Sequence, residues 1–217
     1  GGRFVTAYMG TDNSGDATRT AARLLAEELG AEHHEGAIQD AVETHVRLLE
    51  EMTGVRLGWQ DASHDIPLQN VQARLRGSLI WMIANINHAL LISTSNKSEA
   101  AVGYATMDGD TSGGISLIAD VPKSLVVEWL EWAAAFHGME SVQHVIATPA
   151  TAELRPKDRK QTDEEDLMPF FVLDQLMYQF VQLGQEPLVI FRTLWPRLGA
   201  RYGGDPAAFA ADIRKFV

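Results

Sequence analysis

Short apolar runs alternate with amphipathic segments along the first half of the chain. In the amphipathic segments the apolar residues recur every three or four positions, which is typical of helices that bury one face. We expect strands at residues 3–10, 32–38 and 89–94, and helices at residues 17–30, 39–54 and 67–87. Strands that alternate with helices favour parallel pairing, because a parallel connection needs a crossover. The pattern therefore predicts an α/β fold with a doubly wound, Rossmann-like parallel sheet.

The pattern changes after residue 115, where helical periodicity replaces the alternation. Residues 123–138 and 166–184 are expected to be helices, and a long charged loop, ATPATAELRPKDRKQTDEED, lies between them. Loops of this length are often functional. We expect residues 1–217 to form one domain. We divide it into an α/β core over residues 1–150 and a charged loop with extra C-terminal helices over residues 151–217.

The charge balance excludes some classes of partner. Eighteen Lys and Arg stand against 29 Asp and Glu, which gives a formal net charge of -11 at pH 7. Such a chain has no general attraction for nucleic acid or for an anionic membrane. The absence of cysteine excludes thiolate metal sites and suits a reducing compartment, so we expect a cytoplasmic protein. The chain starts Gly1-Gly2 and enters a strand almost at once, and we expect it to be a fragment of a longer protein.

A dense polar cluster, STSNKSE at residues 93–99, follows the apolar run ALLIS. Open α/β folds place their sites at the carboxyl ends of strands. Asn96 followed by Glu99 is the spacing of a capping box, in which both side chains satisfy free backbone N–H groups at a helix start. In the alternative interpretation, the helix start and Thr94 bind a phosphate and Glu99 holds a magnesium ion against it. The spacing leaves both interpretations open.

Three cationic side chains are candidates for binding an anion. Lys123 follows Pro122 at a predicted helix start, where the helix dipole disfavours a cation unless an anion is near. Arg74 and Arg76 share a predicted helix. Their stems cover the helix surface in one interpretation, and their guanidinium groups bind phosphate or carboxylate in the other.

Other polar residues give weaker signals. Asp108 and Asp110 lie in the glycine-rich segment DGDTSGG, which we interpret as a solvated turn rather than a metal site. The seven histidines show no metal-ligand spacing, so no histidine metal site is predicted. We interpret Trp59 and His64 as side chains that pack a loop, and TDNSGD at residues 11–16 as a turn.

Four segments occur in a fixed order: NVQARLRG, LLISTSNKSEAAVGYATMDGDTSGGISLIADVPKSLV, TPATAELRP and QTDEEDLMPFFVLD. Together they resemble the synthetase domain of NAD synthetases, especially the glutamine-dependent type. The similarity runs from about Arg3 to the helix near Phe180. It implies the adenine nucleotide alpha hydrolase-like sheet of the N-type ATP pyrophosphatases and a homo-oligomer built on a dimer of synthetase domains.

The resemblance also implies a reaction, the ATP-dependent amidation of deamido-NAD. The nicotinate carboxylate attacks the α-phosphate of ATP and releases pyrophosphate, and ammonia then displaces AMP from the acyl-adenylate to give NAD. ATP is a substrate and magnesium a cofactor in this scheme. In the glutamine-dependent type the ammonia comes from a separate glutaminase domain of the nitrilase type, and nothing in this sequence resembles that domain.

Site residues follow from the resemblance by position. On the ATP side, Thr94 and Thr151 match hydroxyl residues that contact ATP, and Lys123 matches a lysine at the triphosphate. Glu99 matches the magnesium-linked glutamate that also borders deamido-NAD, and Glu99 and Lys123 are the catalytic candidates.

On the deamido-NAD side, Asn70 and Arg74 match substrate-binding residues. The sequence departs from the ammonia-dependent branch, where a lysine follows the equivalent of Thr106 and an aspartate lies in the next glycine loop. Met107 and Gly114 stand there instead, which favours the glutamine-dependent branch.

One departure concerns the whole family. The glycine-rich pyrophosphate loop SGGxDS that members carry after their first strand does not occur in residues 1–217. We expect it upstream in a longer protein. The alternative is a non-catalytic nucleotide-binding module of the same architecture.

Overall fold

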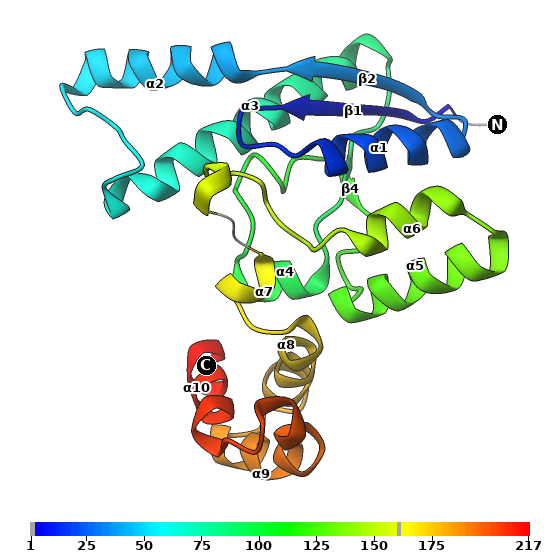
Figure 1. The fold of residues 1–217 in the computed structure, drawn as a ribbon, viewed down its shortest axis with the longest axis vertical. Helices are drawn as coiled ribbons and strands as arrows, with labels where there is room; N and C mark the ends of the chain where they lie inside the picture. The colour runs from blue at the N-terminus through cyan, green and yellow to red at the C-terminus, as the bar shows by residue number, and fades with distance from the viewer. Residues whose placement is uncertain (1–2, 160–161) are drawn as a thin grey trace.

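The computed structural model describes residues 3–159 and 162–217. Its strands lie among helices in the upper part of Figure 1, and the last three helices form a bundle in the lower part. The strands are β1 (Val5–Gly10), β2 (Glu32–Ala37), β3 (Ile92–Ser93) and β4 (Ile115–Ser116). The helices are α1 (Asp16–Glu28), α2 (Gln39–Thr53), α3 (Asp65–Ile86), α4 (Lys97–Val102), α5 (Lys123–His137), α6 (Glu140–Ala147), α7 (Asp163–Asp166), α8 (Phe170–Met177), α9 (Pro187–Leu198) and α10 (Pro206–Phe216). The predicted alternation from the first strand to the third helix is confirmed.

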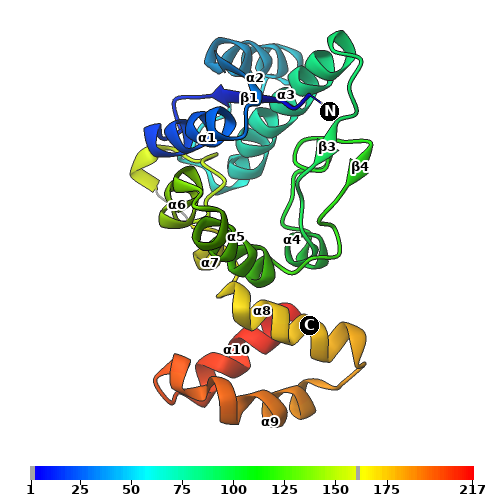
Figure 2. The same cartoon turned by 90° about the vertical axis from the view of Figure 1, so that its right-hand side faces the viewer.

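The strands are parallel, as predicted, but they form two separate pairs. β1 pairs with β2, with Val5 opposite Glu32, and β3 pairs with β4, with Ile92 opposite Ile115. Figure 2 shows β1 apart from β3 and β4, and residues of α3 line the space that separates β1 from β3. The strand expected at residues 89–94 is therefore shorter and less buried than predicted, since Leu90 is 67% exposed.

A groove of about 850 Å³ separates β1 from the segment that contains β3. Glu32 N of β2 donates to Phe4 O, so the backbone carbonyl of Phe4 faces β2. Backbone groups alternate in direction along a strand, so those of Val5, Ala7 and Met9 face the groove. Apart from Met9 O, which accepts a hydrogen bond from Arg76 Nε, this edge of β1 thus lies open to the groove.

The largest buried side chains lie in the C-terminal bundle. Its fully buried members come from three helices: Val172, Leu173, Leu176, Ile190, Leu194 and Phe209. Trp195 stacks on Phe191 and on Phe209 at the side of this core. The bundle contacts the α/β part through α8, which packs against α4 and α5.

Helix α8 starts later than the predicted helix at residues 166–184. Pro169 is its N-cap, and a proline there is tolerated because its missing N–H would have no partner inside the helix. A π-helical turn, Tyr178–Gln182, continues the helix toward Gly184. No helix in the described part of the chain is long and apolar enough to cross a membrane.

Candidate functional site

The polar cluster after β3 forms the start of α4. The Asn96 side chain accepts a hydrogen bond from Glu99 N at 3.1 Å, and Asn96 N donates to Glu99 Oε2 at 3.2 Å. The predicted capping box is therefore confirmed. It leaves the second carboxylate oxygen of Glu99 free for another partner.

That partner is Lys123. Its Nζ donates to Glu99 Oε1 at 3.1 Å. Lys123 is the first residue of α5, so Glu99 is the anion that a lysine at a helix N-terminus requires. The Lys123 ammonium also lies 5.4 Å from the ring centroid of Phe170 on α8. The structure thus brings together the two residues predicted to be catalytic.

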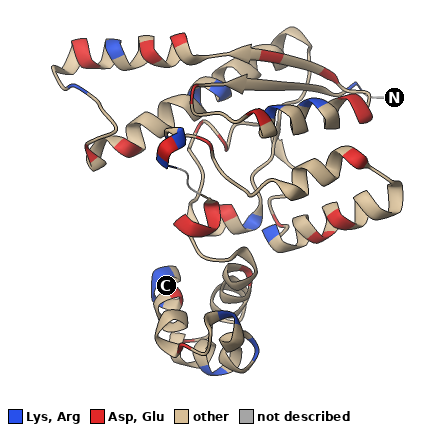
Figure 3. Cartoon of the chain, viewed as in Figure 1, with Lys and Arg blue, Asp and Glu red and all other residues tan. Residues whose placement is uncertain are grey.

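Acidic groups of α7 lie beside this pair. Tyr104 Oη donates to Asp163 Oδ1 at 3.3 Å and to Asp166 Oδ2 at 3.0 Å. Burial raises the pKa of the Asp163 carboxyl, and Lys123 opposes that shift. Burial, followed by the charge of Asp163, raises the pKa of Tyr104 and keeps the phenol protonated. Figure 3 shows α7 as an acidic turn.

Sequence reasoning missed this acidic group. The run QTDEED lies in the predicted charged loop and in a segment that resembles the family, and no site residue is predicted in it. The spacing of Thr162 and Glu165 is the signal that could have found it, because these two residues form a second capping box and start α7.

The two residues predicted to contact deamido-NAD lie one turn apart on α3. Asn70 Oδ1 accepts a hydrogen bond from Thr106 Oγ1 at 2.9 Å, and Arg74 Nε donates to Met107 O at 3.1 Å. Both therefore touch the loop between α4 and β4. A cavity of about 380 Å³ is lined by Asn70, Thr106, Tyr104 and Asp166, among others. This cavity connects the predicted substrate side with the acidic group.

The two threonines predicted to contact ATP lie in different cavities. Thr94 lines the groove between the strand pairs. Thr151 lines a cavity of about 480 Å³ within the charged loop, and its Oγ1 accepts a hydrogen bond from Glu153 N at 3.3 Å. The structure does not gather these hydroxyls around Lys123.

Other polar residues singled out in the sequence have structural partners. Arg76 Nε donates to Met9 O at 3.0 Å, and burial lowers the pKa of its guanidinium. Asp110 accepts a hydrogen bond from Thr106 N at 2.7 Å and so closes its turn. His64 Nδ1 accepts a backbone N–H of its own loop at 3.3 Å.

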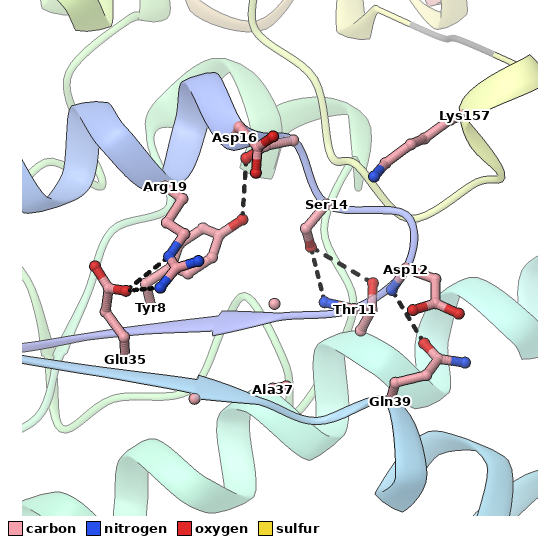
Figure 4. Close-up of a pocket in the computed structure, with 13 residues that line it drawn as sticks. Tyr8, Thr11, Asp12, Ser14, Asp16, Arg19, Glu35, Ala37, Gln39 and Lys157 are labelled. Carbon is pink, nitrogen blue, oxygen red and sulfur yellow. Dashed lines mark hydrogen bonds and ion pairs between the residues drawn. The ribbon is translucent and has the colours of Figure 1, made fainter.

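A further cavity, of about 650 Å³, lies at the carboxyl ends of β1 and β2 (Figure 4). Such strand ends are the usual ligand position in open α/β folds. Arg19 Nε donates to Glu35 Oε2 at 2.7 Å on one side of it, and Lys157 reaches toward it from the charged loop. Its turn, residues 11–16, gave no functional signal in the sequence because Thr, Asp, Asn, Ser and Gly are typical of any turn.

Comparison with known proteins identifies the family. The model of the family described as NAD synthase matches residues 2–194. The chain belongs to the NAD synthase family. It is 38% identical over 167 residues to a glutamine-dependent NAD(+) synthetase of Thermotoga maritima, covering 76% of the chain and 27% of that protein. It is 30% identical to the glutamine-dependent NAD(+) synthetase of Arabidopsis thaliana, over 98% of the chain and 31% of that protein.

Solved structures of the family share the fold. The crystal structure of a glutamine-dependent NAD(+) synthetase from Cytophaga hutchinsonii matches with a TM-score of 0.77 and 34% identity, covering 98% of the chain and 32% of that protein. An NH3-dependent NAD synthetase from Campylobacter jejuni matches with a TM-score of 0.60 and 22% identity, over 98% of the chain and 73% of that protein. The chain thus spans about a third or less of the glutamine-dependent relatives named here.

Proposed function

We propose that this chain is the synthetase part of a glutamine-dependent NAD synthetase. In this proposal it amidates deamido-NAD at the expense of ATP, through an acyl-adenylate. The observation that carries it is the Glu99–Lys123 pair, which lies at the carboxyl end of β3 where two helices start. Its membership of the NAD synthase family supports the same reaction.

Lys123 and the predicted binding residues have distinct roles in this proposal. The Lys123 ammonium supplies positive charge for the triphosphate, because a lysine side chain binds phosphate oxygens as a point charge. Such charge stabilises the transition state most when it is fixed in advance. Thr94 and Thr151, from two different cavities, supply hydroxyl donors to ATP in this proposal. Asn70 and Arg74 hold deamido-NAD beside the pair.

Magnesium belongs to the proposal because ATP reactions need charge neutralised at the phosphates. Within the described residues, no three His, Cys, Asp or Glu side chains are grouped to hold a metal ion. Magnesium, however, is commonly held by one or two carboxylates together with substrate phosphates. Glu99 fits that role through Oε1, the oxygen that accepts from Lys123. Bound there, the ion would neutralise phosphate charge.

The ammonia in this proposal comes from a glutaminase domain, and the assembly is a homo-oligomer. The source of ammonia rests on the relatives, which are named glutamine-dependent NAD(+) synthetases, and the homo-oligomer rests on the family resemblance alone.

The test is deamido-NAD-dependent exchange of pyrophosphate into ATP, measured with the complete coding product. Exchange that needs both magnesium and deamido-NAD is the expected result. Nucleotide binding without exchange would overturn the proposal and favour a non-catalytic module.

Residues 1–217 alone give a second prediction. They lack SGGxDS, and we expect no exchange above a control without protein. Measurable exchange by residues 1–217 would show that the pyrophosphate loop is dispensable and that this part of the proposed mechanism is wrong.

A further inference from the structure

The start of α5 lacks a cap of its own. The first backbone N–H groups of a helix have no partner within it, and the N-cap residue Pro122 offers no side-chain acceptor. Two other elements supply the acceptors. Lys123 N donates to Ser98 Oγ at 2.8 Å, and Ser124 N donates to Asp174 Oδ2 at 2.9 Å.

Asp174 connects three helices at this point. From α8, its Oδ2 also accepts from Ser124 Oγ at 2.6 Å, and its Oδ1 accepts a short hydrogen bond from Ser98 Oγ. Ser98 is the neighbour of Glu99 in α4, and Ser124 is the neighbour of Lys123 in α5. One carboxylate therefore fixes the residue beside each member of the Glu99–Lys123 pair.

Asp174 is buried without a cation. It is 6% exposed and Ser98 is fully buried, and no Lys, Arg or His in the described part of the chain forms an ion pair with it. A buried charge is costly unless hydrogen bonds and dipoles satisfy it. Three donors and the N-terminus of a 15-residue helix do so here.

We propose that Asp174 is the positioning residue of this site: it holds the starts of α4 and α5 in the arrangement that lets Lys123 meet Glu99. The inference rests on the proposed function for its effect on rate. Both carboxylate oxygens face helix donors, so Asp174 acts through Lys123 and Glu99 rather than on the substrate. A misplacement of about 1 Å can cost roughly 100-fold in rate.

The test uses Asp174→Asn, which keeps the size of the side chain and removes one acceptor and the charge. Asp212→Asn is the matched control. Asp212 accepts from Tyr202 Oη at 2.6 Å, and so makes a similar carboxylate–hydroxyl contact in the bundle, away from the pair. We expect Asp174→Asn to slow pyrophosphate exchange by about 10- to 100-fold with KM for deamido-NAD within about 3-fold, and Asp212→Asn to leave the rate within about 2-fold.

A second readout does not depend on activity. Amide hydrogen exchange at Ser124 should accelerate at least about 10-fold in Asp174→Asn and stay unchanged in Asp212→Asn, because only the first variant alters the carboxylate to which Ser124 N donates. If the wild type shows no pyrophosphate exchange, the proposed function fails while the amide measurement still tests the positioning role. Unchanged amide protection, or equal rate losses in the two variants, would overturn the inference.

A folding failure would not end the test. If Asp174→Asn gives no cooperative unfolding transition, Ser98→Ala and Ser124→Ala each remove one hydroxyl donor to the same carboxylate. A rate loss greater than that of Asp212→Asn at equal melting temperature supports the positioning role. Rates equal to wild type in both serine variants contradict it.

Discussion

Glu99 holds its carboxylate between two donors of different kinds. Oε2 accepts from the backbone N–H of Asn96, and Oε1 accepts from Lys123. The capping role and the proposed metal role thus use different oxygens. The two interpretations that the spacing left open are compatible within one side chain.

Glu99→Gln separates the two roles. Glutamine keeps an acceptor for the capping box, so the free energy of unfolding should change by well under ~1 kcal/mol, which the melting temperature would report. The loss of charge should reduce pyrophosphate exchange about 100-fold, with partial recovery at high magnesium. The melting temperature and exchange would be measured side by side across a magnesium titration.

Glu165→Gln is the control for this change. Glu165 occupies the same position in the capping box of α7, and no ion pair with Lys, Arg or His involves it among the described residues. The rate of pyrophosphate exchange of Glu165→Gln should equal that of the wild type. Near-normal turnover of Glu99→Gln at low magnesium would return Glu99 to a capping role alone.

At this scale the sequence reveals local contacts and hides distant ones. Asn96 and Glu99 are three residues apart, and their capping box was predictable. Lys123 and Glu99 are 24 residues apart, and only the family resemblance placed them in one site. Asp174 is 76 residues from Ser98, and its position in an apolar helical run carried no sign of its partners.

Among the elements, α6 depends on α1 for its start. Ser141, near the N-terminus of α6, donates from both N and Oγ to Glu28 Oε2 at the end of α1. These hydrogen bonds lower the pKa of Glu28. A carboxylate supplied by one helix therefore caps the next one and joins the two.

The lowered pKa predicts a dependence of stability on pH. The pKa of Glu28 is lower in the folded state than in the unfolded state. The stability that its carboxylate contributes is therefore present above the ordinary glutamate pKa and is lost as pH falls through the folded pKa. Glu28→Gln should therefore lower the melting temperature at pH 7 and make the difference from wild type shrink below about pH 4. Thermal unfolding at pH 7, 5 and 3.5 would measure it.

Glu27→Gln is the neighbouring control. Glu27 pairs with Arg23 on an exposed face of α1, and exposed pairs contribute little. A difference in melting temperature between wild type and Glu28→Gln that stays constant from pH 7 to 3.5 would contradict the role assigned to Glu28.

Helices with a clear apolar period and the strands β1 and β2 were predictable as elements, whereas β4 and the division into two strand pairs were not. The register of β3 and β4 involves only two residue pairs, too few to produce a periodic signal. The charged loop likewise concealed α7, because a four-residue helix has no apolar face to detect.

On the scale of the whole molecule, the main apolar core lies in the bundle and the proposed site in the α/β part. Phe209 is fully buried at the centre of the bundle. Phe209→Ala should destabilise the bundle by about 3–5 kcal/mol, the usual cost of a large cavity. Denaturant unfolding would measure this loss of stability. Near-ultraviolet circular dichroism would follow the packing of Trp195, which stacks on Phe209.

Phe136→Ala is the control, since Phe136 is 70% exposed on α5. Its effect should stay within about 0.5 kcal/mol. Because α8 belongs to both the bundle core and the contact with α4 and α5, Phe209→Ala should also weaken the Glu99–Lys123 arrangement. Equal stability of the two variants would contradict this assignment of the core.

The open edge of β1 beside the groove affects how copies of the protein meet one another. The groove-facing backbone groups of β1, apart from Met9 O, which accepts from Arg76, form a template to which an extended peptide can add. Mutual repulsion from a net charge of -11 opposes such encounters at neutral pH. That repulsion vanishes near the isoelectric point of about 5.0, so acidification toward that pH favours association of copies through this edge.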